Sequence, residues 1–155
     1  MEKSKDILGL AAEFAVASEL CRRSIYAQLT LGLRKRTDIL VETEDGMLRI
    51  QVKGKKRGEW PWCKGIYGKD IVLVFVDFEK KKENERPDFY ILTEEDWKNL
   101  IKKLIQTGKV ELIDEKNIPA WKDGYQGIRI NPEMIKEHQE RWDKIAKMVG
   151  NEGAK

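Results

Sequence analysis

The hydrophobic and polar positions along the chain predict an α/β fold. Ile71 to Phe78 is a near-continuous apolar and β-branched run, which is typical of a central strand buried on both faces. Apolar residues at helical spacing predict three helices, over 6–23, 94–106 and 132–148. Shorter runs predict strands at 25–31 and 88–92. Helices interleaved with strands in this order predict a sheet covered by helices on both sides.

Residues at the ends of these segments support the helix boundaries. Thr93 followed by Asp96 resembles an N-cap signal, and Gly108 is expected to end the second helix. Asn131-Pro132 places a cap and a first-position proline at the start of the last helix. The segment 55–69 is expected to be a loop, and 109–131 to hold irregular or short-strand structure, in which Trp121 and Tyr125 are packing residues.

The segment 37–54 predicts a β-hairpin, because an Asp-Gly step separates two strand-like runs. With Asp45 and Gly46 as a two-residue turn, Asp38 lies opposite Lys53. Gln51 then shares their face, because strand side chains alternate between the two faces of a sheet. A three-residue turn would shift this register by one. The opposite face is expected to point into the core through Ile39, Val41, Ile50 and Val52.

Length and composition indicate one soluble domain over residues 1–150, with a frayed tail at 151–155. The net charge is +3, so basic character is local and not global. No apolar run approaches the length of a membrane span, and the N-terminus lacks a signal-peptide pattern, so a cytoplasmic location is expected.

The cysteines and the single histidine exclude two kinds of chemistry. Cys21 and Cys63 have no metal-site spacing, and His138 is expected on an exposed helix face. These observations argue against a zinc ribbon and against a histidine-dependent nuclease mechanism. Cys21 is expected to be a small buried residue.

Glu13 stands out in the first predicted helix because it lies on the apolar side, between Ala17 and Leu20. A buried carboxylate needs a partner. The structural alternative is a salt bridge, or an edge position that reaches water. Next to Asp38, Gln51 and Lys53, a functional role is favoured.

The chemistry of these residues fits phosphodiester hydrolysis with Mg²⁺ or Mn²⁺, since Mg²⁺ takes oxygen ligands from one or two carboxylates plus water and phosphate. Asp38 is the principal candidate ligand, with the Gln51 side-chain oxygen and the Val52 carbonyl as further ligands. Lys53 would position the attacking water and offset charge in the transition state. Glu13 would bind the metal directly or through water.

Together these residues resemble the PD-(D/E)XK nuclease superfamily, which includes restriction enzymes and Holliday-junction resolvases. The resemblance spans about the first ninety residues and rests on Gly9-Leu10-Ala11-Ala12-Glu13, Thr37-Asp38 and Arg49-Ile50-Gln51-Val52-Lys53. It implies a restriction-endonuclease-like mixed β-sheet flanked by helices, and a metal-dependent endodeoxyribonuclease. Cutting both strands of DNA, duplex or branched, would favour a homodimer.

The sequence departs from the motif at two positions. Thr37 replaces the proline, which only shapes the backbone, and Gln51 replaces an acidic metal ligand. The loss of one negative charge weakens the expected metal affinity. A catalytically inactive nuclease fold that binds nucleic acid is therefore the main alternative, and a regulatory protein that docks a partner through its first helix is a third.

A basic and aromatic stretch directly follows the candidate strand. Lysine and arginine neutralise phosphates, and tryptophan can stack on unpaired bases. The alternative is a solvated turn in which the tryptophans cap the core. The candidate nucleic-acid contacts are Arg34, Lys35, Arg36, Lys55, Lys56, Arg57, Trp60, Trp62 and Lys64.

Overall fold

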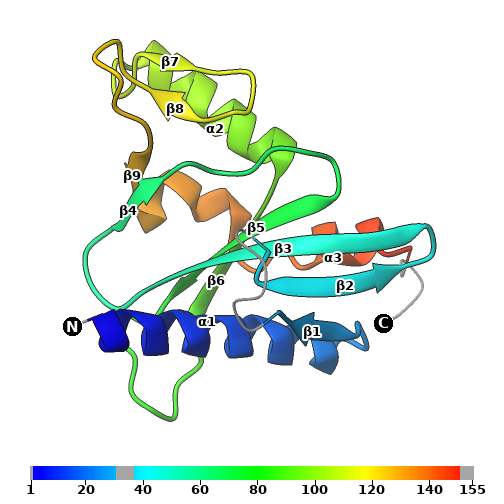
Figure 1. The fold of residues 1–155 in the computed structure, drawn as a ribbon. Coiled ribbons are helices and arrows are strands. Elements are labelled where there is room, and N and C mark those ends of the chain that lie inside the picture. The colour runs from blue at the N-terminus through cyan, green and yellow to red at the C-terminus, as the bar shows by residue number, and fades with distance from the viewer. Residues whose placement is uncertain (1, 31–36, 151–155) are drawn as a thin grey trace.

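The computed structural model describes residues 2–30 and 37–150. Its centre is a five-stranded mixed sheet of order β1-β2-β3-β5-β6 (Figure 1). The strands are β1 (Ala27–Leu29), β2 (Ile39–Thr43), β3 (Gly46–Lys55), β5 (Ile71–Asp77) and β6 (Asp88–Thr93). Of these five strands, only β3 and β5 pair in parallel. The expected α/β class and mixed sheet flanked by helices are confirmed.

The hairpin of β2 and β3 forms, but its register differs from the predicted one by two residues. Thr43 pairs with Gly46, so Glu44 and Asp45 make the turn and Ile39 pairs with Ile50. Gly46 has φ +154° and opens β3 instead of lying in the turn. A shift of two leaves each side chain on its expected face. The predicted core positions therefore hold: Ile39, Val41 and Ile50 are fully buried, and Val52 packs against them.

Strand β5 separates two hydrophobic clusters, as expected of a strand buried on both faces. Val72, Val74 and Val76 contribute to the cluster formed with α1 (Glu2–Arg22) and α3 (Asp143–Met148). Leu73 and Phe75 contribute to the cluster formed with α2 (Glu94–Gln106). Figure 1 shows α1 along one side of the sheet and α2 on the other.

Helix α2 has the boundaries and the cap that the sequence predicts. The Thr93 side chain accepts the Asp96 N–H, and the Asp96 carboxylate accepts the Thr93 N–H, which makes a capping box. Trp97, Leu100, Ile101 and Leu104 are buried along one face. Gly108, with φ +77°, follows the helix end.

The two long connections contain short strands that build a lobe on the α2 side of the sheet. β4 (Trp60–Cys63) pairs antiparallel with β9 (Ile128–Ile130), and β7 (Leu112–Ile113) pairs with β8 (Pro119–Ala120). The predicted loop 55–69 therefore contains one strand. A proline inside β4 and its distant partner hide this strand from local sequence patterns.

The predicted last helix is broken in two. A 3₁₀ helix, η1 (Pro132–His138), precedes α3, and Asn131 caps η1 as expected. Glu140 has φ +57°, and its N–H is donated to the Phe89 carbonyl instead of continuing a helix. His138 is buried, not exposed as predicted, and Cys21 is exposed, not buried.

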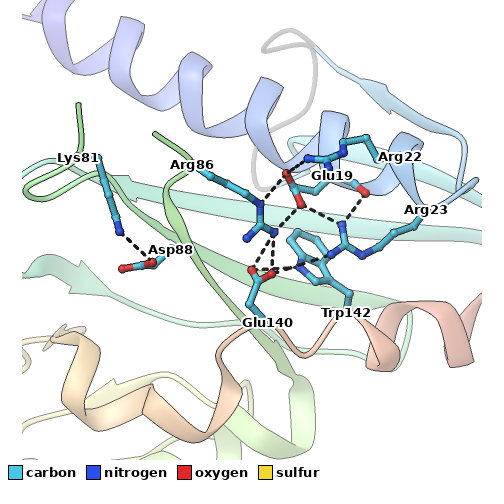
Figure 2. Close-up of polar contacts among 8 residues, drawn as sticks. All are labelled: Glu19, Arg22, Arg23, Lys81, Arg86, Asp88, Glu140 and Trp142. Carbon is cyan, nitrogen blue, oxygen red and sulfur yellow. Dashed lines mark hydrogen bonds and ion pairs between the residues drawn. The ribbon is translucent and has the colours of Figure 1, made fainter. Parts of the chain in front are cut away.

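An ion-pair network ties α1 to the chain before β6 and to the turn after η1 (Figure 2). The buried Glu19 carboxylate accepts hydrogen bonds from Arg86 and Arg23, and Arg86 also contacts Glu140. Arg23 lies over the Trp142 ring at 4.7 Å. Three segments far apart in sequence are thus held together on the α1 side of the sheet.

Among the helices of the described residues, none combines the length and the apolar character that crossing a bilayer requires.

Candidate active site

Asp38 lies immediately before β2, where the β2–β3 ladder ends. Its backbone N–H is donated to the Ile50 carbonyl at 2.9 Å, and its carboxylate Oδ2 accepts the Val52 N–H at 2.7 Å. Because β2 does not extend past this point, the Asp38 side chain replaces a strand carbonyl as the acceptor for Val52. The β2–β3 ladder ends at the Ile39–Ile50 pair, and the Asp38 N–H also reaches the Ile50 carbonyl, so Asp38 lies beside Ile50 and not opposite Lys53 as predicted.

Gln51 is buried, with 7% of its surface exposed, and its Oε1 has no hydrogen-bond partner. Among the side chains described, those of residues 7–30 and 37–150, it is the only fully buried oxygen or nitrogen in this condition. A buried acceptor without a donor costs roughly 1 to 3 kcal/mol. Among the described residues, none donates a hydrogen bond to this amide oxygen, so it is available to a cation or to another donor.

The Val52 carbonyl points toward the same edge as the Val52 N–H, because both groups of a strand residue face the same neighbouring strand. β2 begins at Ile39, so it does not pair with this edge of β3 at Val52. The Asp38 carboxylate and the Val52 carbonyl thus lie on the same edge of β3. Lys53 is half-buried and lies on the same face of β3 as Gln51, two residues further along the strand.

Glu13 comes to this region from α1. It is half-buried, and its pKa is raised, first by burial and then by the negative charge of Asp38. Burial also raises the pKa of Asp38, against the opposing effects of the Val52 N–H and the Lys53 charge. Asp38 therefore interacts electrostatically with Glu13 on α1 and with Lys53 on β3.

Glycine allows the close approach of α1 to this end of β3. A Cβ on Gly54 would lie 2.8 Å from the Ala12 Cβ and 3.6 Å from the Leu8 carbonyl oxygen. Gly54 directly follows Lys53, and Ala12 directly precedes Glu13. The same contact that packs the helix on the strand therefore sets the position of Glu13 relative to the candidate ligands.

The donor set suits a hard divalent cation. Two carboxylates, one unpaired amide oxygen and one carbonyl are oxygen ligands of the kind that Mg²⁺ prefers, with water and substrate phosphate completing the shell. The described residues contain no group of three or more His, Cys, Asp or Glu placed to hold a metal. Cation binding here would thus depend on the neutral oxygens of Gln51 and Val52.

The basic and aromatic stretch divides between the core and the surface. Lys55 is buried, its ammonium 2.9 Å from Asp77 and 3.2 Å from Glu79, so it is not an exposed phosphate contact. Trp60 is 1% exposed and packs on Phe75, so it cannot stack on a base. These two assignments are corrected, because long-range partners bury both side chains.

The other predicted contacts of this stretch face solvent. Lys56, Arg57 and Lys64 are exposed, and Trp62 is 58% exposed. Trp62 stacks on Tyr125 with ring centroids 5.7 Å apart, and Tyr125 is also exposed, contrary to its predicted packing role. The predicted contacts Arg34, Lys35 and Arg36 lie outside the described residues.

Cys63 is a neighbour of the site that the sequence did not indicate. Burial raises the pKa of its thiol to about 12, against the opposing charge of Lys53. The thiol therefore stays protonated and does not act as a nucleophile. Only the β3–β4 packing brings this cysteine near Lys53, so no local sequence signal predicts the contact.

Comparison with known proteins supports the fold and does not give a family. No known family model matches the chain, and no curated protein matches it. A solved bacterial homing endonuclease, I-Ssp6803I, is similar in structure with a TM-score of 0.52 and 14% sequence identity. The similarity covers 97% of this chain and 98% of the endonuclease chain. The chain thus shares its fold with that endonuclease over nearly its whole length.

Proposed function

We propose that this chain is a metal-dependent endodeoxyribonuclease of the PD-(D/E)XK type. The buried, unpaired Oε1 of Gln51 is the observation that carries this proposal, and the Asp38 carboxylate accepts the N–H of the next residue, Val52. The Gln51 oxygen would supply a metal ligand at the motif position where the superfamily has an acidic residue. A fold shared with a homing endonuclease supports a DNA phosphodiester as substrate.

The candidate residues would have two roles in hydrolysis: some would bind the metal ion, and Lys53 would offset the charge on the phosphate. A bound Mg²⁺ or Mn²⁺ would polarise the phosphate and lower the pKa of an attacking water. Asp38, Gln51 and the Val52 carbonyl would hold the cation, with Glu13 acting directly or through water. Lys53 would orient the water and offset the charge that develops on the phosphate oxygens.

Cleavage of supercoiled plasmid and of branched oligonucleotides, with Mn²⁺ and with chelator, tests this function. Asp38→Asn keeps an oxygen that can accept the Val52 N–H and removes only the charge, so the fold should persist. Lys53→Met keeps the apolar stem and removes the ammonium. Each change should lower the cleavage rate by at least about 100-fold, whereas Lys56→Met should leave the folding of the chain unchanged.

The cleavage rates of the two site variants decide whether this site cuts DNA. Metal-dependent cutting that both site variants abolish would support the nuclease. Cutting that survives in both variants would rule out this site as its source. Unchanged circular dichroism spectra must accompany the losses, since a misfolded variant would also fail to cut.

A DNA-binding protein without cleavage is the second candidate, and Gln51 favours it because the site has one negative charge fewer than the motif. This alternative predicts no cutting with either metal. It also predicts a gel shift that weakens steeply with salt and in the variants of Lys56 and Arg57. Affinity that does not depend on salt would argue against it.

A homodimer fits the outer face of α1. Ile7, Leu10 and Phe14 recur at helical spacing and are exposed by 67%, 38% and 53%. A Cβ on the neighbouring Gly9 would meet nothing within 4 Å, so a second helix can approach here. One candidate site per chain would cut one strand, so we propose that two copies pack α1 against α1 to cut both.

Light scattering tests the dimer. The wild-type protein should have twice the chain mass, and Phe14→Glu should reduce it to one chain while circular dichroism stays the same. A monomeric wild type at high concentration would contradict the dimer without affecting the proposed chemistry of each site.

A further inference from the structure

A cavity of about 600 Å³ lies in the lobe on the α2 side of the sheet, apart from the candidate active site. Its walls come from β4, from β9, and from the segments that follow α2 and β8. Its lining includes three aromatic side chains, Trp62, Trp121 and Tyr125, and two cationic side chains, Lys109 and Arg129. The proposed hydrolysis uses none of these residues.

The exposure of Trp62 is imposed by the backbone. The pairing of β4 with β9 shifts register between Trp60 and Cys63, and these two side chains are buried while Trp62 faces outward. Trp62 has φ +51°, a conformation that residues other than glycine rarely adopt. Such a conformation persists only where the surroundings enforce it, and it recurs at binding sites.

Gly127 on the partner segment fixes this arrangement. It has φ +95°, and a Cβ there would lie 3.1 Å from the carbonyl carbon and oxygen of Trp62. The backbone of the two segments therefore meets closely only because position 127 lacks a side chain. The close approach holds the indole at the edge of the cavity instead of in the core.

Trp62 and Tyr125 form an aromatic platform there. Their ring planes are inclined by 24° with centroids 5.7 Å apart, and they are 58% and 60% exposed. Each ring thus keeps a large accessible surface. Aromatic faces of this kind stack on nucleobases with little dependence on base identity.

Charged groups around the platform suit the rest of a nucleotide. Lys109 and Arg129 line the cavity, and Lys64 lines a neighbouring hollow that shares Tyr125. Glu59 and Asp123 also line the cavity. Carboxylate oxygens can accept hydrogen bonds from the exocyclic amino groups of bases, whereas the cations can pair with the flanking phosphates.

We propose that this cavity binds one unpaired base of DNA, stacked against the Trp62–Tyr125 platform, with Lys109, Arg129 and Lys64 contacting the phosphates on either side. This inference rests on DNA as the substrate class in the proposed function, but it does not require cleavage. It assigns the chain a preference for DNA in which a base is extruded or unpaired.

Binding measured in chelator isolates this preference from cutting. Fluorescence anisotropy would compare a duplex carrying a single-base bulge with a fully paired duplex of the same flanking sequence. The wild-type protein should bind the bulged duplex at least about fivefold more tightly. Trp62→Ala should remove this preference, and Trp62→Phe, which keeps a ring, should retain most of it.

Two further variants make the result specific. Tyr125→Ala should also remove the preference, and it carries the test if Trp62→Ala disturbs β4. Tyr67→Ala removes an aromatic side chain that is 56% exposed outside the cavity and should keep the wild-type preference.

Equal affinity of the wild type for the two duplexes would overturn the proposal, as would a preference that survives in both platform variants. An equal loss of affinity for both duplexes in Trp62→Ala would also overturn it, because that result indicates a general contact. Cleavage is assayed separately with Mn²⁺. If the protein prefers the bulged duplex but does not cut DNA, this inference stands and the proposed nuclease activity is ruled out.

Discussion

Gly54 packs against Ala12 so closely that a Cβ added to Gly54 would lie 2.8 Å from the Ala12 Cβ. These two residues directly adjoin Lys53 and Glu13, which belong to the candidate site. The distance between helix α1 and strand β3 is therefore set next to the residues that would act on the substrate.

Gly54→Ala should destabilise the fold by roughly 1 to 3 kcal/mol, because the added methyl group overpacks the α1–β3 contact. Urea unfolding measures the loss. Gly9→Ala is the matched control, since a Cβ there meets nothing within 4 Å, and alanine in a helix should add about 0.5 to 1 kcal/mol of stability. Equal effects of the two changes would contradict this account of the contact.

Lys55→Met should cost about 3 to 5 kcal/mol of stability, because it leaves the buried Asp77 carboxylate without its cation. The control is Lys56→Met, the exposed neighbour, which should change stability by less than about 0.5 kcal/mol. Chemical denaturation compares the two. If Lys55→Met unfolds at the wild-type midpoint, the ion pair with Asp77 does not form in solution.

The Glu19 network should make stability depend on acid pH. The Glu19 carboxylate accepts hydrogen bonds from Arg86 and Arg23, and these hold its pKa below the ordinary value of 4.5, the one from Arg86 most strongly. The unfolded state therefore takes up the proton first as pH falls. The contribution of Glu19 is complete above that ordinary value and is lost as pH drops through the lowered pKa.

Glu19→Gln tests this dependence through unfolding measured over a series of acid pH values. The stability difference between wild type and variant should shrink as pH falls below about 4.5. Glu83→Gln changes an exposed glutamate and should leave the pH profile of the wild type unchanged. A difference that stays constant with pH would show that Glu19 acts through packing alone.

Gln51→Glu should strengthen metal binding, because it restores the acidic ligand of the motif. We expect Mn²⁺ to bind about tenfold more tightly, and the added ion to raise the unfolding temperature more in the variant than in the wild type. Gln28→Glu makes the same chemical change at an exposed position of β1 and should not respond to Mn²⁺. An equal response in both variants would place the ion elsewhere.

Local sequence signals predicted the hairpin, the central strand and helix α2, since alternation, β-branched runs and a capping box act within a few residues. The hairpin register was off by two because the Asp45-Gly46 step does not occupy the two central turn positions. Long-range contacts account for the other errors. The Asp77 carboxylate buries Lys55, and the Phe89 carbonyl interrupts the last helix at Glu140.

The candidate site was predictable to a similar extent. Gln51 and Lys53 share a face of β3 in any hairpin register, because they are two residues apart on one strand. The convergence of Asp38 with them stays a prediction. The Val52 N–H held by Asp38 and the unpaired Gln51 oxygen depend on where β2 begins. No residue pattern shows that boundary in advance. The Trp62–Tyr125 platform joins positions 63 residues apart in the chain, so it lay beyond local patterns as well.

Strand β5 contributes alternate residues to both hydrophobic clusters. If either cluster unfolded, water would reach one face of β5, and its backbone hydrogen bonds to β3 and β6 would break. Neither half can then come apart while the other stays intact, and the last amides of β5 to exchange with solvent should report on both. The molecule is thus expected to unfold as one cooperative unit, in which the candidate active site and the lobe that carries Trp62 and Tyr125 are lost together.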